Sequence, residues 1–322
     1  MVPLRTRVYI DGYNLYYGSL RKTPYKWLDL LKLFEEQLLP AVPYQQNLTE
    51  PPVQMVLDPC AIRFFTAPIL TRVAKGSDSV QSQLMYHKAL EASGRISITY
   101  GYYSLAKSNQ YLVDSDDPDK DPNQCGKISV WKLEEKQTDV NLALALYEDA
   151  LSCPELDQLV LVTNDTDIAP ALALIKKKRP GLVIGLVNPT RPEPATAAGN
   201  GGQLEREVNV ELRKHADWTR KLILPAELAA SQFPRVVRRK NKDAIKPISW
   251  YARPDLLEAA MTAALPIKPK PGEFFQWAEK ANTYMEGHRP IDLLESDAGA
   301  EVVMAYIIGY IRDHLPRGTP LP

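Results

Sequence analysis

Four aspartates on three separate segments are the residues of this chain best suited to chemistry. Asp11 follows the short apolar stretch 8–10, and Asp165 and Asp167 follow the apolar stretch 159–163. Apolar stretches of this length that end in a polar turn are typical of strands buried in a parallel sheet. Ligands of open α/β sheets bind at the carboxyl ends of the strands, so we expect these acids to meet at one edge.

The fourth acid, Asp139, stands at the start of a helix expected over 138–151, with Thr138 as its cap. Helical spacing predicts a buried stripe on this helix, made of Val140, Ala143, Leu144, Tyr147 and Leu151. A purely structural reading stays open for each acid. Asp167 is well placed to cap the next helix, Asp165 to make a turn, and Asp139 to interact with a helix dipole.

Carboxylates held close together need a compensating partner. Two of them about 4 Å apart repel by roughly 4 kcal/mol at an effective dielectric constant near 20. They then either take up protons or bind cations. Oxygen ligands without histidine or thiolate favour Mg²⁺ or Mn²⁺, and a metal-bound water can attack a phosphodiester. The acids therefore predict metal-dependent hydrolysis.

Three motifs together resemble the NYN domain, a PIN-like nuclease fold, in its bacterial LabA-like branch. They are VYIDGYNLYYG at 8–18, EEKQTDVNLALAL at 134–146 and LVTNDTDIAPAL at 161–172. The resemblance implies an endoribonuclease that hydrolyses RNA with Mg²⁺ or Mn²⁺. The implied site residues are the metal ligands Asp11, Asp139, Asp165 and Asp167, the catalytic companion Asn14, and the substrate-binding residues Asn164 and Lys136.

Alternating strand and helix patterns predict an α/β fold in which a PIN-like, mostly parallel sheet is flanked by helices over 1–234. Strands are expected at 62–66, 96–103 and 182–187, besides those that precede the acids. The polar stretch 104–127 is expected to be a surface loop.

A basic and proline-rich connector is expected over 235–272. Its residues Arg238, Arg239 and Lys240 are candidates for contacts with the phosphates of single-stranded RNA, although such stretches are often solvated linkers.

The segment 273–322 is expected to form a small all-α domain. Its residues Trp277, Asn282, Gly287, Pro290, Leu293, Leu294, Gly299 and Val303 resemble the toxin-binding domain of Xre/MbcA/ParS antitoxins. The resemblance implies self-association into a homo-oligomer or docking of a regulatory protein, in a toxin-antitoxin or RNA-processing system. The alternative is a small helical cap packed on the larger domain.

The composition limits the remaining possibilities. A formal net charge of zero excludes a global basic field, and three widely spaced cysteines argue against disulfides and zinc, so we expect a cytoplasmic protein without a membrane span. The GNGG at 199–202 is not a dinucleotide fingerprint. Tyr16, Tyr17 and Trp27 are expected in the core, with base stacking as the alternative.

Two other functions stay open. One is a non-catalytic RNA-binding regulatory protein that recruits partners through its C-terminal domain. The other is a phosphatase of the haloacid-dehalogenase kind, suggested by Asp165-Thr166-Asp167, but Ala169 replaces the threonine of that motif.

Overall fold

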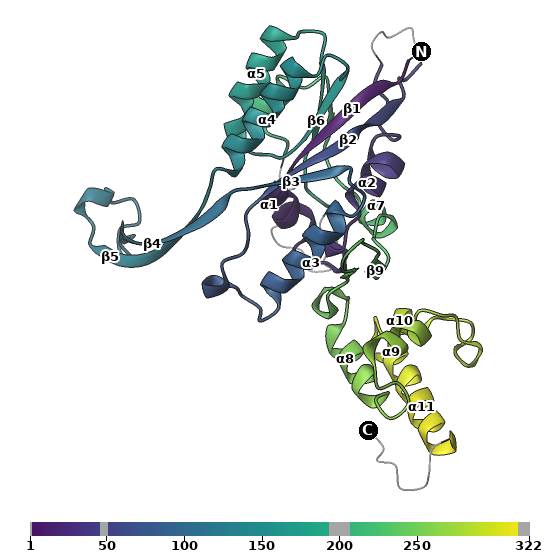
Figure 1. Ribbon diagram of the computed structural model, residues 1–322. Helices are drawn as coiled ribbons and strands as arrows, with labels where there is room; N and C mark the ends of the chain where they lie inside the picture. The colour runs from purple at the N-terminus through teal and green to yellow at the C-terminus, as the bar shows by residue number, and fades with distance from the viewer. Residues whose placement is uncertain (1, 46–50, 193–206, 315–322) are drawn as a thin grey trace. The chain divides into compact units, whose positions relative to one another are not determined.

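A computed structural model describes residues 2–45, 51–192 and 207–314. The chain divides into two compact units (Figure 1). The first comprises Met1–Arg21 and Leu28–Ile245, and the second comprises Lys22–Trp27 and Lys246–Pro322.

The first unit is built on a six-stranded sheet in the order β3-β2-β1-β6-β7-β8. Its strands are β1 (Leu4–Asp11), β2 (Met55–Thr66), β3 (Ile96–Tyr100), β6 (Gln158–Val162), β7 (Val183–Val187) and β8 (Trp218–Arg220). Every neighbouring pair is parallel, which confirms the predicted α/β fold with a mostly parallel sheet.

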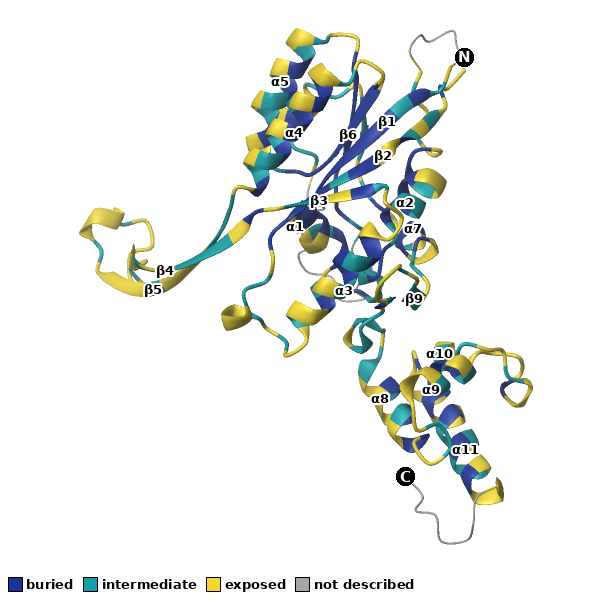
Figure 2. Cartoon of the chain, in the orientation of Figure 1, coloured by how far each residue is buried: buried dark blue, intermediate teal, exposed yellow. Residues whose placement is uncertain are grey.

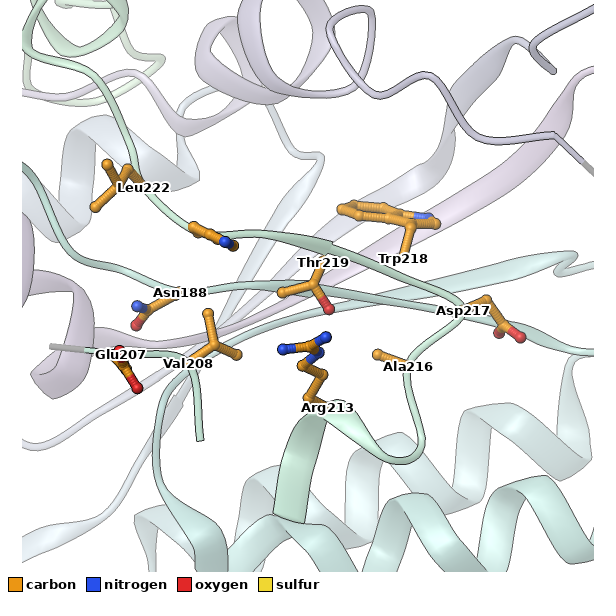
Figure 3. Close-up of a pocket in the computed structure, with 10 residues that line it drawn as sticks. Asn188, Glu207, Val208, Arg213, Ala216, Asp217, Trp218, Thr219 and Leu222 are labelled. Atoms are coloured by element: carbon orange, nitrogen blue, oxygen red, sulfur yellow. The ribbon is translucent and has the colours of Figure 1, made fainter. Parts of the chain in front are cut away.

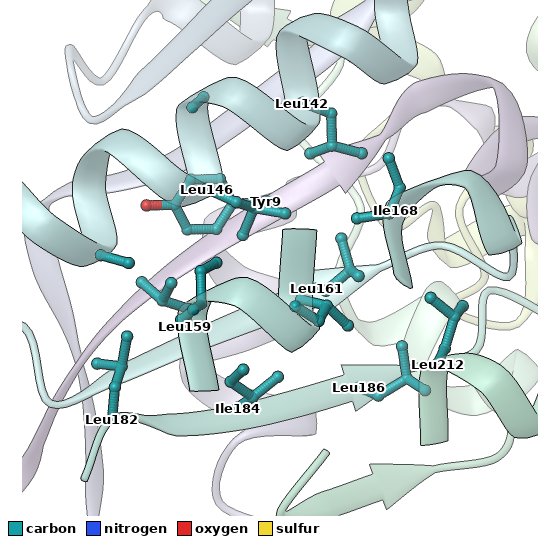
Figure 4. Packing of buried hydrophobic residues seen from close by; sticks show 14 of the residues in the cluster. Tyr9, Leu142, Leu146, Leu159, Leu161, Ile168, Leu182, Ile184, Leu186 and Leu212 are labelled. Carbon is teal, nitrogen blue, oxygen red and sulfur yellow. The ribbon is translucent and has the colours of Figure 1, made fainter. Parts of the chain in front are cut away.

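Helices cover both faces of this sheet, so every residue of β6 and β7 is buried. Side chains of one face pack under α4 (Thr138–Ser152) and α5 (Ala169–Lys178), as Figure 4 shows for Tyr9, Leu161 and Leu186. The other helices of the unit are α1 (Gly12–Leu15), the π-helix η1 (Tyr16–Leu20), α2 (Leu30–Lys32), which continues into the π-helix η3 (Leu33–Leu38), α3 (Ser79–Glu91), α6 (Val210–Arg213) and α7 (Pro225–Ala230).

Helix α4 buries a different stripe from the predicted one. Val140 and Leu144 are 60% and 61% exposed, whereas Leu142 and Leu146 are fully buried. The same buried side carries Asp149, which forms an ion pair with Arg7. The prediction was wrong because it counted only apolar residues and missed a buried charge on the helix.

Two further strands, β4 (Tyr102–Tyr111) and β5 (Lys127–Lys136), form an antiparallel ribbon that projects from the first unit (Figure 1). We call this ribbon, with its connecting turn 112–126, the arm. The predicted surface loop over 104–127 is thus confirmed for 112–126, but it was wrong for 104–111 and Lys127, which belong to the strands. A ribbon without a buried face lacks the strict polar and apolar alternation by which strands are recognised. A short pair, β9 (Val236–Val237) and β10 (Ala244–Ile245), ends the unit.

The second unit is helical, as expected for the end of the chain. It contains α8 (Pro254–Ala263), α9 (Pro271–Ala278), α10 (Pro290–Leu293) and α11 (Asp297–His314) around a core of its own. The boundary lies after Ile245, so the expected connector 235–272 is shared between the two units. Among the described helices of both units, none is long and apolar enough to cross a membrane.

Candidate active site

Asp11 lies at the carboxyl end of β1 and is only 2% exposed. Its carboxylate caps α1 by accepting a hydrogen bond of 2.9 Å from the Asn14 backbone amide. It also accepts bonds of 2.5 Å from the Asn14 side chain and 2.8 Å from the Thr163 hydroxyl. Burial nevertheless raises the pKa of Asp11 above its ordinary value. Asn14 is thus a hydrogen-bond partner of the carboxylate.

Asp139 lies at the start of α4, half-buried, after Gln137 has turned the chain with a left-handed φ of 73°. Burial raises the pKa of Asp139 to about 6, and the charges of four neighbouring carboxylates add to this effect. These neighbours are Asp11, Asp165, Glu135 and Asp167. The structure therefore brings the four predicted aspartates together.

Glu135 joins this cluster. The sequence matches it, with Lys136, to the Glu-Lys pair of the NYN motif, but only Lys136 was assigned a role in the site. Its carboxylate accepts hydrogen bonds of 2.6 Å from the Thr138 hydroxyl and 3.4 Å from the Tyr103 hydroxyl. Burial raises the pKa of Glu135, and the charge of Asp11 raises it further. The missed signal was a strand that ends directly before the helix of Asp139. We call Asp11, Glu135, Asp139, Asp165 and Asp167 the carboxylate cluster.

Burial and mutual repulsion raise the pKa values of Asp11, Glu135 and Asp139 in this cluster. In the described ranges, no group of three or more His, Cys, Asp or Glu side chains has an arrangement that suits a metal ion. Asp11 uses both carboxylate oxygens to accept hydrogen bonds within the protein. The raised pKa of Asp139 is the effect expected where carboxylates are buried and crowded together.

Three tyrosines lie next to the cluster on α1 and η1. The rings of Tyr13 and Tyr17 are 4.3 Å apart, and those of Tyr16 and Tyr17 are 5.1 Å apart. All three tyrosines are more than a third exposed, whereas Trp27 is fully buried. The prediction that Tyr16, Tyr17 and Trp27 lie in the core is therefore confirmed for Trp27 and wrong for the two tyrosines. After burial and the neighbouring Tyr17, the charge of Glu135 is a further cause of the raised pKa of Tyr13. The tyrosines therefore form an aromatic wall of the site.

A close backbone contact sets the position of this wall. A Cβ atom added at Gly18 would lie 1.8 Å from the carbonyl oxygen of Pro189, in the turn that follows β7. Only a glycine allows this approach without a shift of η1 or of the turn.

The predicted substrate-binding residues lie in three different places. Asn164 is buried and joins the end of β6 to the segment before α6, donating to the Glu207 carbonyl at 2.9 Å and accepting from the Asn209 amide at 2.8 Å. Lys136 pairs with Glu134 at 2.9 Å.

The basic residues after β9 form a separate feature. Arg238 pairs with Asp243 at 2.5 Å, and Arg239 lies 3.8 Å from Glu91. Arg239 and Lys240 line an open hollow of about 670 Å³ with Lys88.

A separate cavity of about 520 Å³ lies next to β7 and β8 (Figure 3). Its lining residues are Asn188, Glu207, Val208, Arg213, Ala216, Asp217, Trp218, Thr219, Lys221 and Leu222. Asp217 already pairs with Lys176 at 2.5 Å. Among the described residues, neither Arg213 nor Lys221 has an ion-pair partner. The cavity therefore offers two cations to an acidic ligand.

One relative decides the family. Over 318 residues, the chain is 45% identical to 6-hydroxy-3-succinoylpyridine 3-monooxygenase HspA of Pseudomonas putida strain S16, and the match covers 98% of this chain and 97% of that protein. The chain belongs to the HspA family. No family model matches. A crystal structure of a protein of unknown function from Vibrio parahaemolyticus is 14% identical, with a TM-score of 0.33, and covers 68% of this chain and 92% of that one.

Membership of the HspA family overturns the predicted activity. The relative is a monooxygenase, and the match covers nearly the whole of both chains. The predictions of an endoribonuclease and of a hydrolase are therefore wrong. The prediction failed for a physical reason. Acids at the ends of parallel strands indicate where on the fold a site lies, but the reaction catalysed there depends on which substrate and cofactor bind. The prediction that Asn164, Lys136 and the basic residues bind RNA depended on the nuclease assignment.

The predicted Mg²⁺ or Mn²⁺ cofactor is wrong as well. A monooxygenase reduces O₂ with two electrons, which a reduced organic cofactor such as a flavin or a nicotinamide can supply. The turn after β1 does not suit the pyrophosphate of a dinucleotide, because Asp11 and Tyr13 stand where a glycine-rich loop would approach it. The GNGG at 199–202 lies outside the described residues. A dinucleotide would therefore have to bind away from this turn.

Proposed function

We propose that this protein is a monooxygenase that inserts one atom of O₂ into a hydroxypyridine carrying an acidic side chain. The second oxygen atom leaves as water, with two electrons and two protons from a reduced nicotinamide or flavin. The observation that carries this proposal is the 45% identity to HspA over nearly the full length of both chains.

The carboxylate cluster suits the hydroxyl end of such a substrate. A carboxyl group with a pKa of about 6 is an effective base near neutral pH, so Asp139 is the proposed acceptor of the proton of the ring hydroxyl. Removing this proton makes the ring richer in electrons and more reactive towards activated oxygen. Tyr13 and Tyr17 offer exposed aromatic faces against which the pyridine can stack.

The cavity suits the acidic end. A succinoyl group ends in a carboxylate, and Arg213 and Lys221 are cations without a described ion-pair partner. Adjacent strands lie about 4.8 Å apart, so the ends of β6 and β8, which are separated by β7, lie roughly 10 Å apart. That span is comparable to the length of a pyridine ring with a four-carbon acid chain. The proposed substrate therefore extends from the cluster into the cavity.

The cytoplasm is the proposed location, because it supplies reduced nicotinamide. The three cysteines support this, since Cys60, Cys125 and Cys153 are all free thiols.

The direct test is to incubate the protein with 6-hydroxy-3-succinoylpyridine, reduced nicotinamide and flavin under isotope-labelled dioxygen. Mass spectrometry should find one labelled oxygen atom in the pyridine product. Substrate consumption without label would contradict oxygen insertion, and no consumption would contradict the substrate class.

Replacing Asp139 with Asn should reduce kcat by a factor of roughly 10² to 10⁴, the usual contribution of a general base. Glu148→Gln is the matched control, because Glu148 is exposed on the same helix. Equal turnover by wild type and Asp139→Asn would rule out the assigned role of Asp139.

Replacing Arg213 with Met should weaken substrate binding by roughly 10- to 100-fold with little change in kcat, since a charge-assisted hydrogen bond is lost. An analogue without the chain carboxylate separates this effect from misfolding. Wild type and Arg213→Met should bind the analogue equally, and a further loss for the variant would place the carboxylate elsewhere.

A further inference from the structure

One face of the arm exposes large apolar side chains in two groups, Leu133 with Trp131 and then Tyr111, with the polar pair Asn109–Ser129 between them. Cross-strand pairing places Leu105 opposite Leu133, and Lys107 opposite Trp131, on the same side of the ribbon. Trp131 is 54% exposed, and Val113 in the connecting turn is 77% exposed. Figure 2 shows partly buried and exposed residues along the arm, in contrast to the buried strands of the central sheet.

On physical grounds, we expect the exposed apolar side chains of the arm to be covered by another protein surface. A two-stranded ribbon is at best marginally stable in water unless one of its faces packs against another layer. Contiguous exposed apolar side chains on a folded protein mark an interaction surface. At the end of the arm, Tyr111, Leu112 and Val113 are consecutive exposed apolar residues of this kind.

Charge is separated along the same face. The turn contains five aspartates and one lysine, of which Asp114 and Lys120 pair at 2.7 Å. Nearer the sheet, the cations Arg72 and Lys107 lie 4.8 Å and 5.5 Å from the centre of the Trp131 ring. In the part of the chain that the structure describes, neither cation has a carboxylate within ion-pair distance. The tip of the arm is thus acidic, and its middle is basic because Lys107 and the neighbouring Arg72, which lies outside the arm, both contact Trp131.

We propose that the arm binds the arm of a second copy of this chain, in antiparallel orientation about a two-fold axis. A two-fold axis brings the same surface of both copies together, so each acidic tip meets the basic middle of the other arm. The exposed Tyr111, Leu112 and Val113 then meet around the axis. An anionic partner such as a nucleic acid is disfavoured, because the tip would repel it.

The proposal differs from the expectation that self-association runs through 273–322. It is also independent of the proposed monooxygenase activity, because its readout is the mass of the particle in solution. Light scattering coupled to gel filtration of the full-length protein should show a dimer at micromolar concentration. A monomeric wild type at that concentration would overturn the proposal.

Val113→Glu places two like charges beside the axis and should raise the dimer dissociation constant by roughly 100-fold or more. Gln110→Glu adds the same charge on β4, on the face opposite to Trp131 and Tyr111, and should leave the dimer intact. Circular dichroism checks that both variants are folded. A dimer that persists in Val113→Glu, or that is lost equally in Gln110→Glu, would show that the arms do not form the interface.

A charge exchange tests the antiparallel geometry itself. One variant carries Arg72→Glu and Lys107→Glu. In the other, Asp116, Asp117, Asp119 and Asp121 are all replaced with Lys, which makes the turn cationic. Each variant alone sets like charges against each other and should be monomeric, whereas the mixture should form heterodimers, since both contacts are again between opposite charges. A mixture that stays monomeric would overturn this arrangement.

Discussion

The two ends of β1 and α4 carry carboxylates in opposite electrostatic surroundings. At one end, Asp58 and Asp149 are buried with arginines, and at the other end, Asp11 and Asp139 lie among other acids. Helix α4 supplies a carboxylate to each end, β1 supplies Arg7 to the paired end and Asp11 to the other, and Asp58 belongs to β2.

The paired end is a continuous network of charges. Arg7 lies 2.7 Å from Asp58 and 2.9 Å from Asp149, and the Tyr9 hydroxyl donates to Asp149 at 2.5 Å. Burial opposes ionisation of Asp58, but hydrogen bonds from Arg7 and Arg5 outweigh it and lower the pKa of Asp58. Asp58 therefore stays charged at neutral pH and takes part in a buried ion pair.

The unpaired end has no such compensation. The carboxylate cluster raises the pKa of Asp139 to about 6, which leaves this group able to exchange a proton near neutral pH. The comparison teaches that a carboxylate among cations contributes to stability, whereas a carboxylate among other carboxylates is available for chemistry. Each of the following predictions tests one side of this contrast.

The largest effect is expected at the paired end. Arg7→Met removes the cation between two buried carboxylates and should lower the free energy of unfolding by about 3 to 5 kcal/mol. Urea denaturation measures this loss. Arg5→Met is the control, because the Arg5 side chain is 41% exposed and should contribute no more than about 1 kcal/mol. Equal losses for the two variants would contradict a buried network centred on Arg7.

A smaller effect is expected where backbone packing shapes the unpaired end. Gly18→Ala sets a methyl group against the Pro189 carbonyl and should cost about 1 to 3 kcal/mol of stability, with a lower kcat because the tyrosine wall shifts. Gly181→Ala, where a Cβ would meet nothing within 4 Å, should have almost no effect on either quantity. Thermal unfolding and steady-state kinetics measure the two quantities. Unchanged stability and kcat in Gly18→Ala would show that this contact does not set the position of the tyrosine wall.

The smallest expected effect is a difference between the two ends in how the free energy of unfolding depends on pH. The pKa of Asp139 is raised from 3.8 to about 6 in the folded protein. The contribution of this group to the free energy of unfolding is therefore fully present below pH 4 and is lost as the pH rises through 6. Asp139→Asn should therefore be more stable than wild type near pH 8, by about 1 to 2 kcal/mol for a half-solvated group, and equal to it near pH 4.

At the paired end, stability changes with pH in the opposite direction. The lowered pKa of Asp58 means that its contribution is present at neutral pH and is lost on acidification. Urea denaturation of wild type and Asp139→Asn across this pH range measures both trends. A difference between the two proteins that grows towards acid pH would contradict the assignment at Asp139.

Much of the site was predictable because topology dictates it. Asp11 and Asp165 end neighbouring parallel strands, so they share an edge whatever the details of packing. Asp139 was predictable for a similar reason, since its helix begins at that edge. The cavity beside Arg213 was not predictable, because it depends on how α6 and β8 meet.

Other features depended on partners that are remote in the sequence. The buried stripe of α4 was misjudged because Asp149 finds Arg7 on a strand 142 positions away along the chain. The arm was missed because ten pairs of partly polar residues carry no burial pattern. The resemblance to the NYN domain stays a prediction, while the nuclease activity that it implied does not survive the relationship to HspA.

The amino-acid sequence by itself determined the parallel sheet, the helical end of the chain and the gathering of acids at one edge, because these follow from apolar periodicity and from the directions of parallel strands. Only the tertiary structure decided which acids meet arginines and which meet one another. That choice sets their pKa values, since the charge a carboxyl group carries depends on its burial and on neighbours that distant parts of the chain provide.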